Sequence, residues 1–211
     1  MKEPFKILKP IPESMHKELV NIYNRCTTYI LHFATAHEKY GEMICDQIWA
    51  ETDNDQQWIH DNILPYYGLT IDNIAELDYS NKQKNDRSDS FSTGFEPPYS
   101  WSKNGINFTR WVAGEAKSML HHDKAPHIPS KLNIPVINTE HGTIYYPEFD
   151  LGFDYKNRHT CLMNVQYKHD ILGLEKITSD RAFLSVPLLD ETKIDHSKFL
   201  SMAEYHNATH V

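Results

Sequence analysis

The sequence lacks any long hydrophobic run. The longest apolar run of its 211 residues, Leu184–Leu189, is short and is interrupted by a proline. A helix that crosses a bilayer needs about 20 mostly apolar residues, so the sequence predicts no membrane-spanning segment. The first residues, MKEPFKILKPIPES, also lack the apolar stretch of a signal peptide. We therefore expect a cytoplasmic protein that has no membrane partner.

Cysteine is scarce. The three cysteines, Cys26, Cys45 and Cys161, are odd in number and form no Cys-x-x-Cys motif. Reduced thiols in a cytoplasmic compartment are the simplest interpretation of this pattern.

Positive charge is also in short supply. Lysine and arginine total 21 against 29 acidic residues, which gives a formal net charge of −8. This balance argues against broad electrostatic binding to nucleic-acid phosphates or anionic lipids. The chain has no internal repeat and no low-complexity segment, and its length predicts a single domain over residues 1–211.

The N-terminal third has the periodicity of helices. From Ser14 to Tyr40 the apolar positions recur every three or four residues, which is one face of a long α-helix. Ser14 is placed to cap its start, and Gly41 is placed to end it. Shorter helices are predicted at Met43–Trp49, Gln56–Leu64 and Ile71–Leu77. Residues 1–79 should therefore be mainly helical.

Residues 80–105 are polar and rich in turn-forming residues, so we expect a long surface loop. A loop of this length in a compact domain is usually either functional or disordered.

Residues 106–190 have a different pattern. Short runs rich in β-branched and aromatic residues are separated by Gly, Pro, Asn or Asp, which is typical of antiparallel strands in a sandwich or barrel. The runs are INFTRWV, SMLHH, KLNIPVI, TIYYPEF, HTCLMNVQY and RAFLSVPLL. The predicted fold class is therefore α+β, with residues 191–211 as a C-terminal tail.

Thirteen histidines suggest a metal site, and one pair is suitably spaced. His121 and Asp123 form His-x-Asp at the end of a predicted strand. Residues i and i+2 of a strand point to the same face, so both side chains can reach one metal ion. Taken alone, this motif favours a solvated loop, because about one His-x-Asp is expected by chance in a chain of this composition.

The order of residues after this motif makes it more specific. The segment INFTRWVAGEAKSMLHHDK leads into the motif. The motif is followed by a pair of strands, then by the lone His169, and then by Arg181 at the start of the last strand. From Gly105 to Leu189 this order resembles the iron(II)- and 2-oxoglutarate-dependent dioxygenases, especially small hydroxylase-like members. His122 leaves open which histidine of the motif binds, and the N-terminal half resembles no family that we can name.

The resemblance implies a fold and an activity. The fold would be a double-stranded β-helix, a jelly-roll or cupin-like barrel, with N-terminal supporting helices. His121, Asp123 and His169 would be the catalytic ligands of Fe(II), because two imidazoles and one carboxylate leave three adjacent coordination positions open. The cosubstrates would be 2-oxoglutarate and O2, and a C–H bond of an unidentified small-molecule or protein substrate would be hydroxylated.

The resemblance also assigns the cosubstrate site. Arg181 would hold the distal carboxylate of 2-oxoglutarate, since a guanidinium offers a planar pair of donors. Ser185 shares the strand face of Arg181 by the two-residue period and could add a hydroxyl. Tyr145 or Asn133, expected on the opposite sheet, could also contribute. The loop at 80–105 would close over the substrate as a lid, or would be a simple linker.

Two alternatives remain at this stage. One is a non-catalytic β-sandwich that acts as a binding or structural protein of viral or mobile-element type. The other is a helical, metal-independent ribonuclease that uses Arg25 and His32, if both lie on one helix. A pair at His206 and His210 has helical metal-ligand spacing but lies in the tail.

Overall fold

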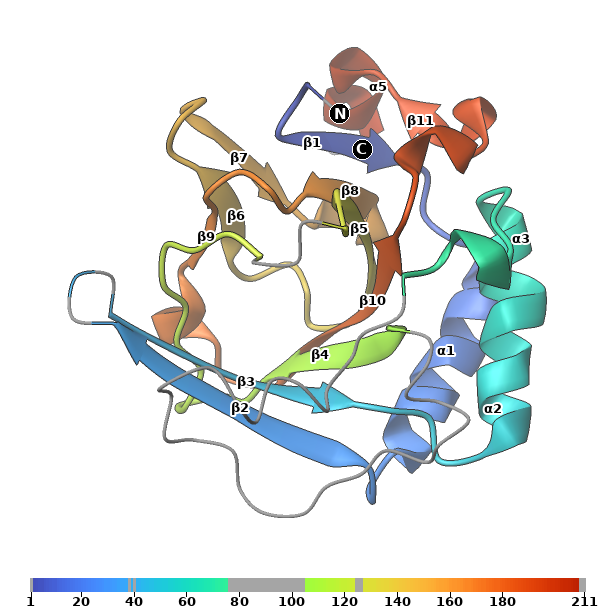
Figure 1. Ribbon diagram of the computed structural model, residues 1–211, viewed down its shortest axis with the longest axis horizontal. Coiled ribbons are helices and arrows are strands. Elements are labelled where there is room, and N and C mark those ends of the chain that lie inside the picture. The colour runs from blue at the N-terminus through green and yellow to red at the C-terminus, as the bar shows by residue number, and fades with distance from the viewer. Residues whose placement is uncertain (1, 38, 40, 76–104, 124–126, 209–211) are drawn as a thin grey trace.

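The computed structural model describes residues 2–37, 39, 41–75, 105–123 and 127–208. They form a mixed α+β structure dominated by antiparallel sheets, so the predicted α+β class is confirmed (Figure 1). No helix in these ranges is both long enough and apolar enough to cross a membrane.

The larger sheet has eight strands in the order β11-β1-β8-β5-β10-β4-β3-β2. Their bounds are β1 Phe5–Leu8, β2 Ile30–His37, β3 Gly41–Ile48, β4 Asn107–Trp111, β5 Ser130–Ile137, β8 Thr160–Asn164, β10 Arg181–Leu188 and β11 Phe199–Leu200. The smaller sheet has the order β7-β6-β9, with β6 Thr143–Tyr146, β7 Leu151–Asp154 and β9 Asp170–Leu172.

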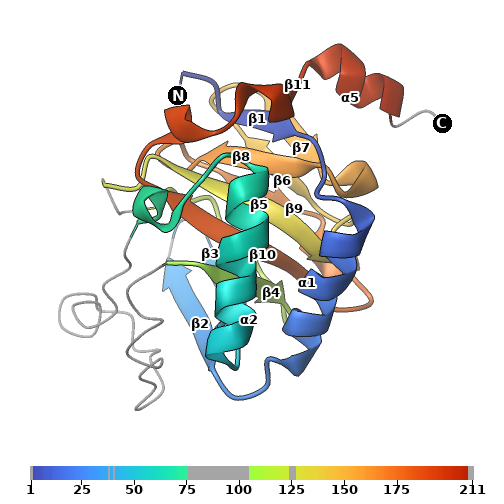
Figure 2. The same ribbon diagram turned by 90° about the vertical axis from the view of Figure 1, so that its right-hand side faces the viewer.

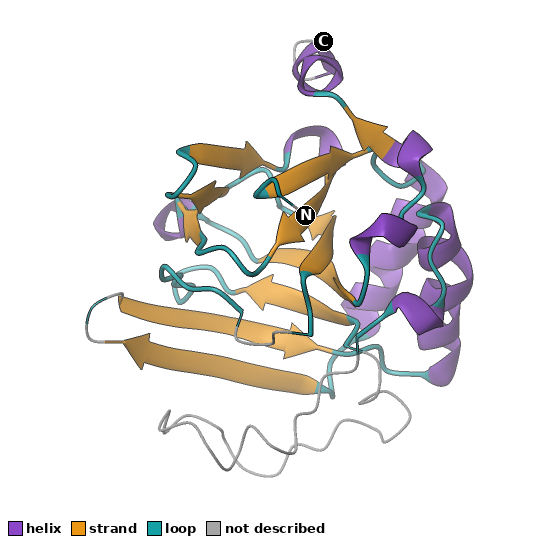
Figure 3. Ribbon diagram, turned by 45° about the horizontal axis from the view of Figure 1, so that its top comes forward, coloured by secondary structure: helices purple, strands orange, loops and turns teal. Residues whose placement is uncertain are grey.

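The helices lie mostly on one face of the larger sheet (Figures 2 and 3). They are α1 Glu13–Arg25, α2 Asp53–Trp58, a π-helical turn at Ile59–Ile63, α3 Leu64–Tyr66, and α5 Met202–Ala208 near the C-terminus. The α2 helix begins at the side chain of Thr52, which accepts a hydrogen bond from the Asp55 amide at 3.1 Å. The helix predicted at Gln56–Leu64 lies within this second helical segment.

From β4 onward the chain passes back and forth between the two sheets. After β4 it reaches His121, whose backbone exchanges two hydrogen bonds with His169 just before β9, at 3.0 and 2.7 Å. This isolated bridge places the segment around His121 next to the start of β9 in the smaller sheet. The chain then alternates: β5 in the larger sheet, β6 and β7 in the smaller, β8 in the larger, β9 in the smaller, and β10 in the larger.

The two faces of the larger sheet differ in chemistry. On β10, Ala182, Leu184, Val186 and Leu188 are fully buried in the apolar core under the helices. Phe183 faces the other way, into a second core between the two sheets. The alternation places Arg181 and Ser185 in this second core, where both are buried.

The long N-terminal helix predicted to Tyr40 is wrong after Arg25. Cys26 has an extended backbone, with φ −77° and ψ 98°, and residues 30–37 form β2. All eight residues of β2 pair with β3, which replaces the helix predicted at Met43–Trp49. The apolar spacing of ILHFATAH suits either structure, and pairing at the edge of the larger sheet decides it.

The predicted helix ends also differ from the structure. Ser14 lies inside α1 and Pro12 occupies its N-cap position, without a side-chain cap. Gly41 has φ +90° at the turn between two strands and does not end a helix. At Ile71–Leu77 only a single 3-10 turn, Ile71–Asn73, forms within the described residues.

In residues 106–190 five of the six predicted runs contain strands, and SMLHH has only the single bridge at His121. Within the predicted tail, β11 pairs with β1, and Tyr205 of α5 is buried in the second core. The predicted lid lies outside the described residues, apart from Gly105.

Candidate metal centre

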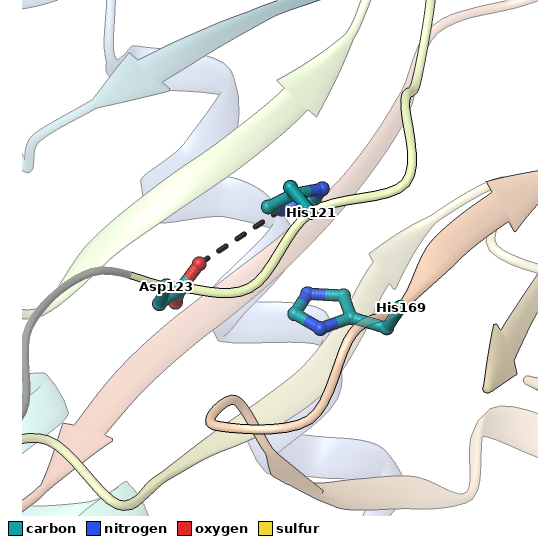
Figure 4. Close-up of side chains that lie close together, drawn as sticks. All are labelled: His121, Asp123 and His169. Atoms are coloured by element: carbon teal, nitrogen blue, oxygen red, sulfur yellow. Dashed lines mark ion pairs between the residues drawn. The ribbon is translucent and has the colours of Figure 1, made fainter. Parts of the chain in front are cut away.

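His121, Asp123 and His169 come together between the sheets, as Figure 4 shows. Their potential ligand atoms all lie within 4.8 Å of one another, and Nε2 of His121 is 3.9 Å from Oδ1 of Asp123. The backbone bridge between the two histidines produces this proximity, because it pairs residues that are 48 positions apart in the sequence. The group could hold a metal ion.

Each histidine is held with one nitrogen available. Nδ1 of His121 lies 2.7 Å from the carbonyl of Met119, and Nδ1 of His169 lies 2.9 Å from the carbonyl of Tyr167. A carbonyl only accepts, so Nδ1 carries the proton in both rings and Nε2 keeps its lone pair. Main-chain acceptors commonly orient metal-binding histidines in this way.

The two oxygens of Asp123 have different neighbours. Oδ2 lies 2.6 Å from the ammonium of Lys131 on β5, whereas Oδ1 is on the side of His121. Burial opposes ionisation of this carboxyl, but the charge of Lys131 and the nearby histidines overcome it and hold the Asp123 pKa below its usual range. The carboxylate is therefore ionised and ready to bind a cation.

His169 is buried, with 5% of its surface exposed. Burial, with a further contribution from His121, lowers the pKa of His169 to about 4. The imidazole is thus neutral at physiological pH, which is the form that binds metals.

Two nitrogens and one oxygen suit a borderline divalent metal such as iron, and the arrangement is two histidines with one carboxylate. Metal–ligand bonds of about 2.1 Å place adjacent donor atoms roughly 3 Å apart. Binding therefore requires the ligand atoms to draw together by roughly 1–2 Å.

Arg181 at the start of β10 is completely buried, with 0% of its surface exposed. Its guanidinium carbon lies 4.6 Å from the centre of the Phe183 ring and 5.6 Å from that of Tyr155. Nη2 donates to the carbonyl of Gly142 at 3.2 Å, whereas Nε and Nη1 have no hydrogen-bond partner. Burial lowers the pKa of this guanidinium to about 10, so it is still charged at pH 7.

A buried arginine with two unpaired donors is energetically costly, because buried charges are normally paired. Within the described part of the chain, Arg181 forms no ion pair. Its fork-shaped donors match a carboxylate. The surroundings of Arg181 thus have the chemistry of a site for an anion.

Of the other residues predicted around Arg181, Ser185 and Asn133 lie on neighbouring strands of the larger sheet, and Tyr145 lies on the smaller sheet. Ser185 is buried on the same face of β10 and pairs in register with Asn133 of β5. Asn133 therefore belongs to the same sheet as Ser185, and the prediction that it lies on the opposite sheet is wrong. Tyr145 lies on the face of β6 opposite to the buried Ile144 and Tyr146, and its hydroxyl donates to Asp150 at 2.8 Å. The structure does not bring Tyr145 to Arg181.

Sequence reasoning missed Tyr155. Its side chain is fully buried between the sheets, packs against Phe183 at a centroid distance of 4.3 Å, and adjoins Arg181. Its hydroxyl lies beside Asn133 and Cys161 but forms a well-aligned hydrogen bond with neither. Tyr155 follows β7 directly. If that strand had been placed correctly from the sequence, its two-residue period would have indicated that Tyr155 points inward.

Sequence reasoning also missed Lys131. It opens the run KLNIPVI, and the two-residue period places it on the same face as Asn133. Nothing in the local sequence indicates its pairing with Asp123, because Lys131 lies on β5 and Asp123 lies in the loop that follows the His121 bridge.

The hypothesis of a helical ribonuclease is wrong, because Arg25 and His32 do not share a helix. Arg25 ends α1 and donates to Asp55 at 2.5 Å; His32 lies on β2 with Nδ1 2.9 Å from Asp46. His206 lies in α5, and His210 falls outside the described residues.

Comparison with known proteins gives no relative: no family model and no curated protein matches this sequence. The function must therefore be argued from the site.

Proposed function

We propose that the chain is an iron(II)- and 2-oxoglutarate-dependent dioxygenase with a double-stranded β-helix fold, which hydroxylates a C–H bond of an unidentified substrate. The observation that carries the proposal is the joint placement of two sites between the sheets. One is a group of two histidines and a carboxylate; the other is a buried arginine with two unpaired donors.

The strand order supports the fold. A jelly-roll barrel has eight antiparallel strands in two facing sheets. If β4 is the first strand and the segment around His121 is the second, the larger sheet supplies four adjacent strands, β4-β10-β5-β8. The smaller sheet supplies β9-β6-β7, and the His121–His169 bridge places the segment around His121 next to the start of β9.

The positions of the residues on these strands support the activity. In the family that the sequence resembles, a His-x-Asp motif and a distal histidine bind iron, and a basic residue about ten positions further on holds 2-oxoglutarate. His121 and Asp123 at the bridge, His169 before β9 and Arg181 at the start of β10 follow the same order.

The polarity of the space between the sheets argues against a purely structural β-sandwich. Facing sheets that only pack together bury apolar side chains. Here the inner face of the larger sheet also carries buried or half-buried polar side chains among its apolar ones. They are Asn107, Lys131, Asn133, Arg181 and Ser185.

Bound iron and 2-oxoglutarate would supply the oxidising chemistry, in which the keto acid is decarboxylated to succinate as O2 is consumed. The chain's own residues would hold and orient these groups. The Nε2 atoms of His121 and His169 and Oδ1 of Asp123 would bind the metal, while Arg181 would donate Nε–H and Nη1–H to the distal carboxylate. The aromatic rings of Tyr155 and Phe183 would exclude water from that ion pair and strengthen it.

Anaerobic addition of Fe(II) and 2-oxoglutarate to the purified chain tests the proposal. We expect the visible charge-transfer absorption of an iron–keto acid chelate, followed by succinate formation when O2 is admitted. Replacing 2-oxoglutarate with succinate should give no such absorption. If 2-oxoglutarate binds neither the protein alone nor the protein with Fe(II), the proposal is wrong.

A further inference from the structure

Lys131 places a positive charge beside the cation site. It extends from the inner face of β5, where its register partners are Met163 of β8 and Pro187 of β10. Its ammonium lies 2.6 Å from Oδ2 of Asp123, and 26% of its side chain is exposed. The charge of Lys131 also acts on His169, so it is felt by more than one member of the group.

This arrangement is unfavourable for a site that binds only a metal ion. Without metal, the charges of Asp123 and Lys131 balance each other. A divalent cation would then leave two positive charges unbalanced at the site. A fixed ammonium repels the incoming cation, and this repulsion is strong in a partly buried site.

The same arrangement suits a metal that enters together with an anion. A dicarboxylate contributes two negative charges and offsets the excess left by the metal. The ammonium of Lys131 has three donors, so it can contact an anion at the metal without leaving Oδ2 of Asp123. By holding Oδ2, it also leaves Oδ1 as the oxygen that faces His121.

We propose that Lys131 is a positioning residue that makes binding of the metal and of the dicarboxylate cooperative. This inference rests on the proposed function. It adds that Lys131 controls the order in which the metal and the dicarboxylate bind. The metal alone binds weakly, and the metal with 2-oxoglutarate binds tightly. Because such coupling is reciprocal, the metal tightens 2-oxoglutarate binding by the same factor.

The test measures binding of Mn2+, which is inert to O2 under these conditions, to the full chain with and without saturating 2-oxoglutarate. Coupling between two ligands is commonly 5- to 150-fold, so we expect 2-oxoglutarate to tighten Mn2+ binding by about tenfold or more in the parent. In Lys131→Met, Mn2+ alone should bind at least as tightly as in the parent. The enhancement by 2-oxoglutarate should fall below about threefold.

Two variants control the measurement. Lys131→Arg keeps the charge and should retain most of the coupling. Lys117→Met removes an exposed lysine that pairs with Glu42, and it should behave like the parent. Thermal unfolding of each variant verifies that it is folded.

The outcomes separate the two proposals. Equal enhancement in Lys131→Met and in the parent would refute the role of Lys131 and leave the dioxygenase proposal intact. Loss of Mn2+ binding in folded Lys131→Met would also refute coupling, since it would mean that Lys131 serves only to orient Asp123. A parent that binds Mn2+ but shows no binding of 2-oxoglutarate would instead overturn the proposed function.

Discussion

Nη1 of Arg181 lies 2.8 Å from the point that a Cβ atom would occupy at Gly142. Gly142 has φ +89°, and its carbonyl accepts the one hydrogen bond of the guanidinium. The absence of a side chain at Gly142 therefore gives the buried guanidinium its space, and the backbone of the same residue holds it in place.

Gly142→Ala should consequently weaken 2-oxoglutarate binding. Alanine in the left-handed region costs about 1–2 kcal/mol of stability, and the new methyl group would also displace Nη1 of Arg181. Gly114→Ala is the matched control, because Gly114 has φ +80° but a Cβ atom added there would have no neighbour within 4 Å. Both variants should lose similar backbone stability in denaturant unfolding, and only Gly142→Ala should lose 2-oxoglutarate affinity in a titration. Equal affinities would contradict the assignment.

Arg181→Met should separate stability from binding. A buried charge without a partner opposes folding, and its replacement by an apolar residue of similar size is often neutral or stabilising by about 1–4 kcal/mol. The free energy of unfolding of the ligand-free variant, measured in urea, should therefore equal or exceed that of the parent, while stabilisation by 2-oxoglutarate disappears. Arg181→Lys should lose about ten- to a hundredfold in affinity, the equivalent of a charged hydrogen bond.

Arg110→Met is an informative contrast. Arg110 donates two hydrogen bonds, at 3.0 and 2.6 Å, to the buried carboxylate of Asp46. Removing Arg110 leaves that carboxylate with less compensation, so this variant should be destabilised. If Arg181→Met is destabilised as strongly, Arg181 is a structural residue.

The proposed metal ligands can be distinguished from their neighbour His122. Asp123→Ala and His169→Ala should each weaken Mn2+ binding by about 100-fold or more, beyond the loss typical of residues that only orient a ligand. His122→Ala should change binding little, because His122 is exposed while His121 is turned into the group. Isothermal titration with Mn2+ measures all three. A large loss in His122→Ala together with a silent His121→Ala would reassign the motif.

The pKa of about 4 for His169 predicts a pH dependence of stability. Between about pH 6.5 and pH 4 the unfolded chain protonates this imidazole and the folded chain does not, so the unfolded state binds more protons. Stability should therefore fall as the pH falls through this window, by about 3 kcal/mol for a shift of this size. The loss is complete below the folded pKa.

Urea unfolding of the metal-free parent and of His169→Gln at several pH values between 7 and 4 isolates this contribution. The parent should lose about 3 kcal/mol more than the variant over this range. Parallel pH profiles would show that His169 is not held as a buried neutral ring.

The group of His121, Asp123 and His169 could be predicted from the sequence because its signals are either close together or follow one another in a recognisable order. His121 and Asp123 share a strand face, and strand signals separate them from His169 and Arg181. The neighbours of Arg181 were harder to predict, since Tyr155 approaches it only through the way the sheets face each other. Lys131 has a similar difficulty, because its partner Asp123 lies in a loop after the His121 bridge.

The error in the N-terminal third has a physical cause. The apolar spacing at 30–37 fits both a helix and a strand. The choice of a strand depends on pairing at the edge of the larger sheet. That sheet also contains β4 and β10, whose residues come more than 60 positions later in the chain. Local periodicity carries no information about such an edge.

The alternation along β10 has a consequence for how this protein tolerates mutation. Ala182, Leu184, Val186 and Leu188 support the helices, whereas Arg181 and Ser185 face the space between the two sheets. A complete substitution scan of this strand, scored separately for abundance and for ligand binding, should therefore alternate with a period of two. Natural variation could then alter cosubstrate or substrate preference from one side of the strand while the other side keeps the chain folded.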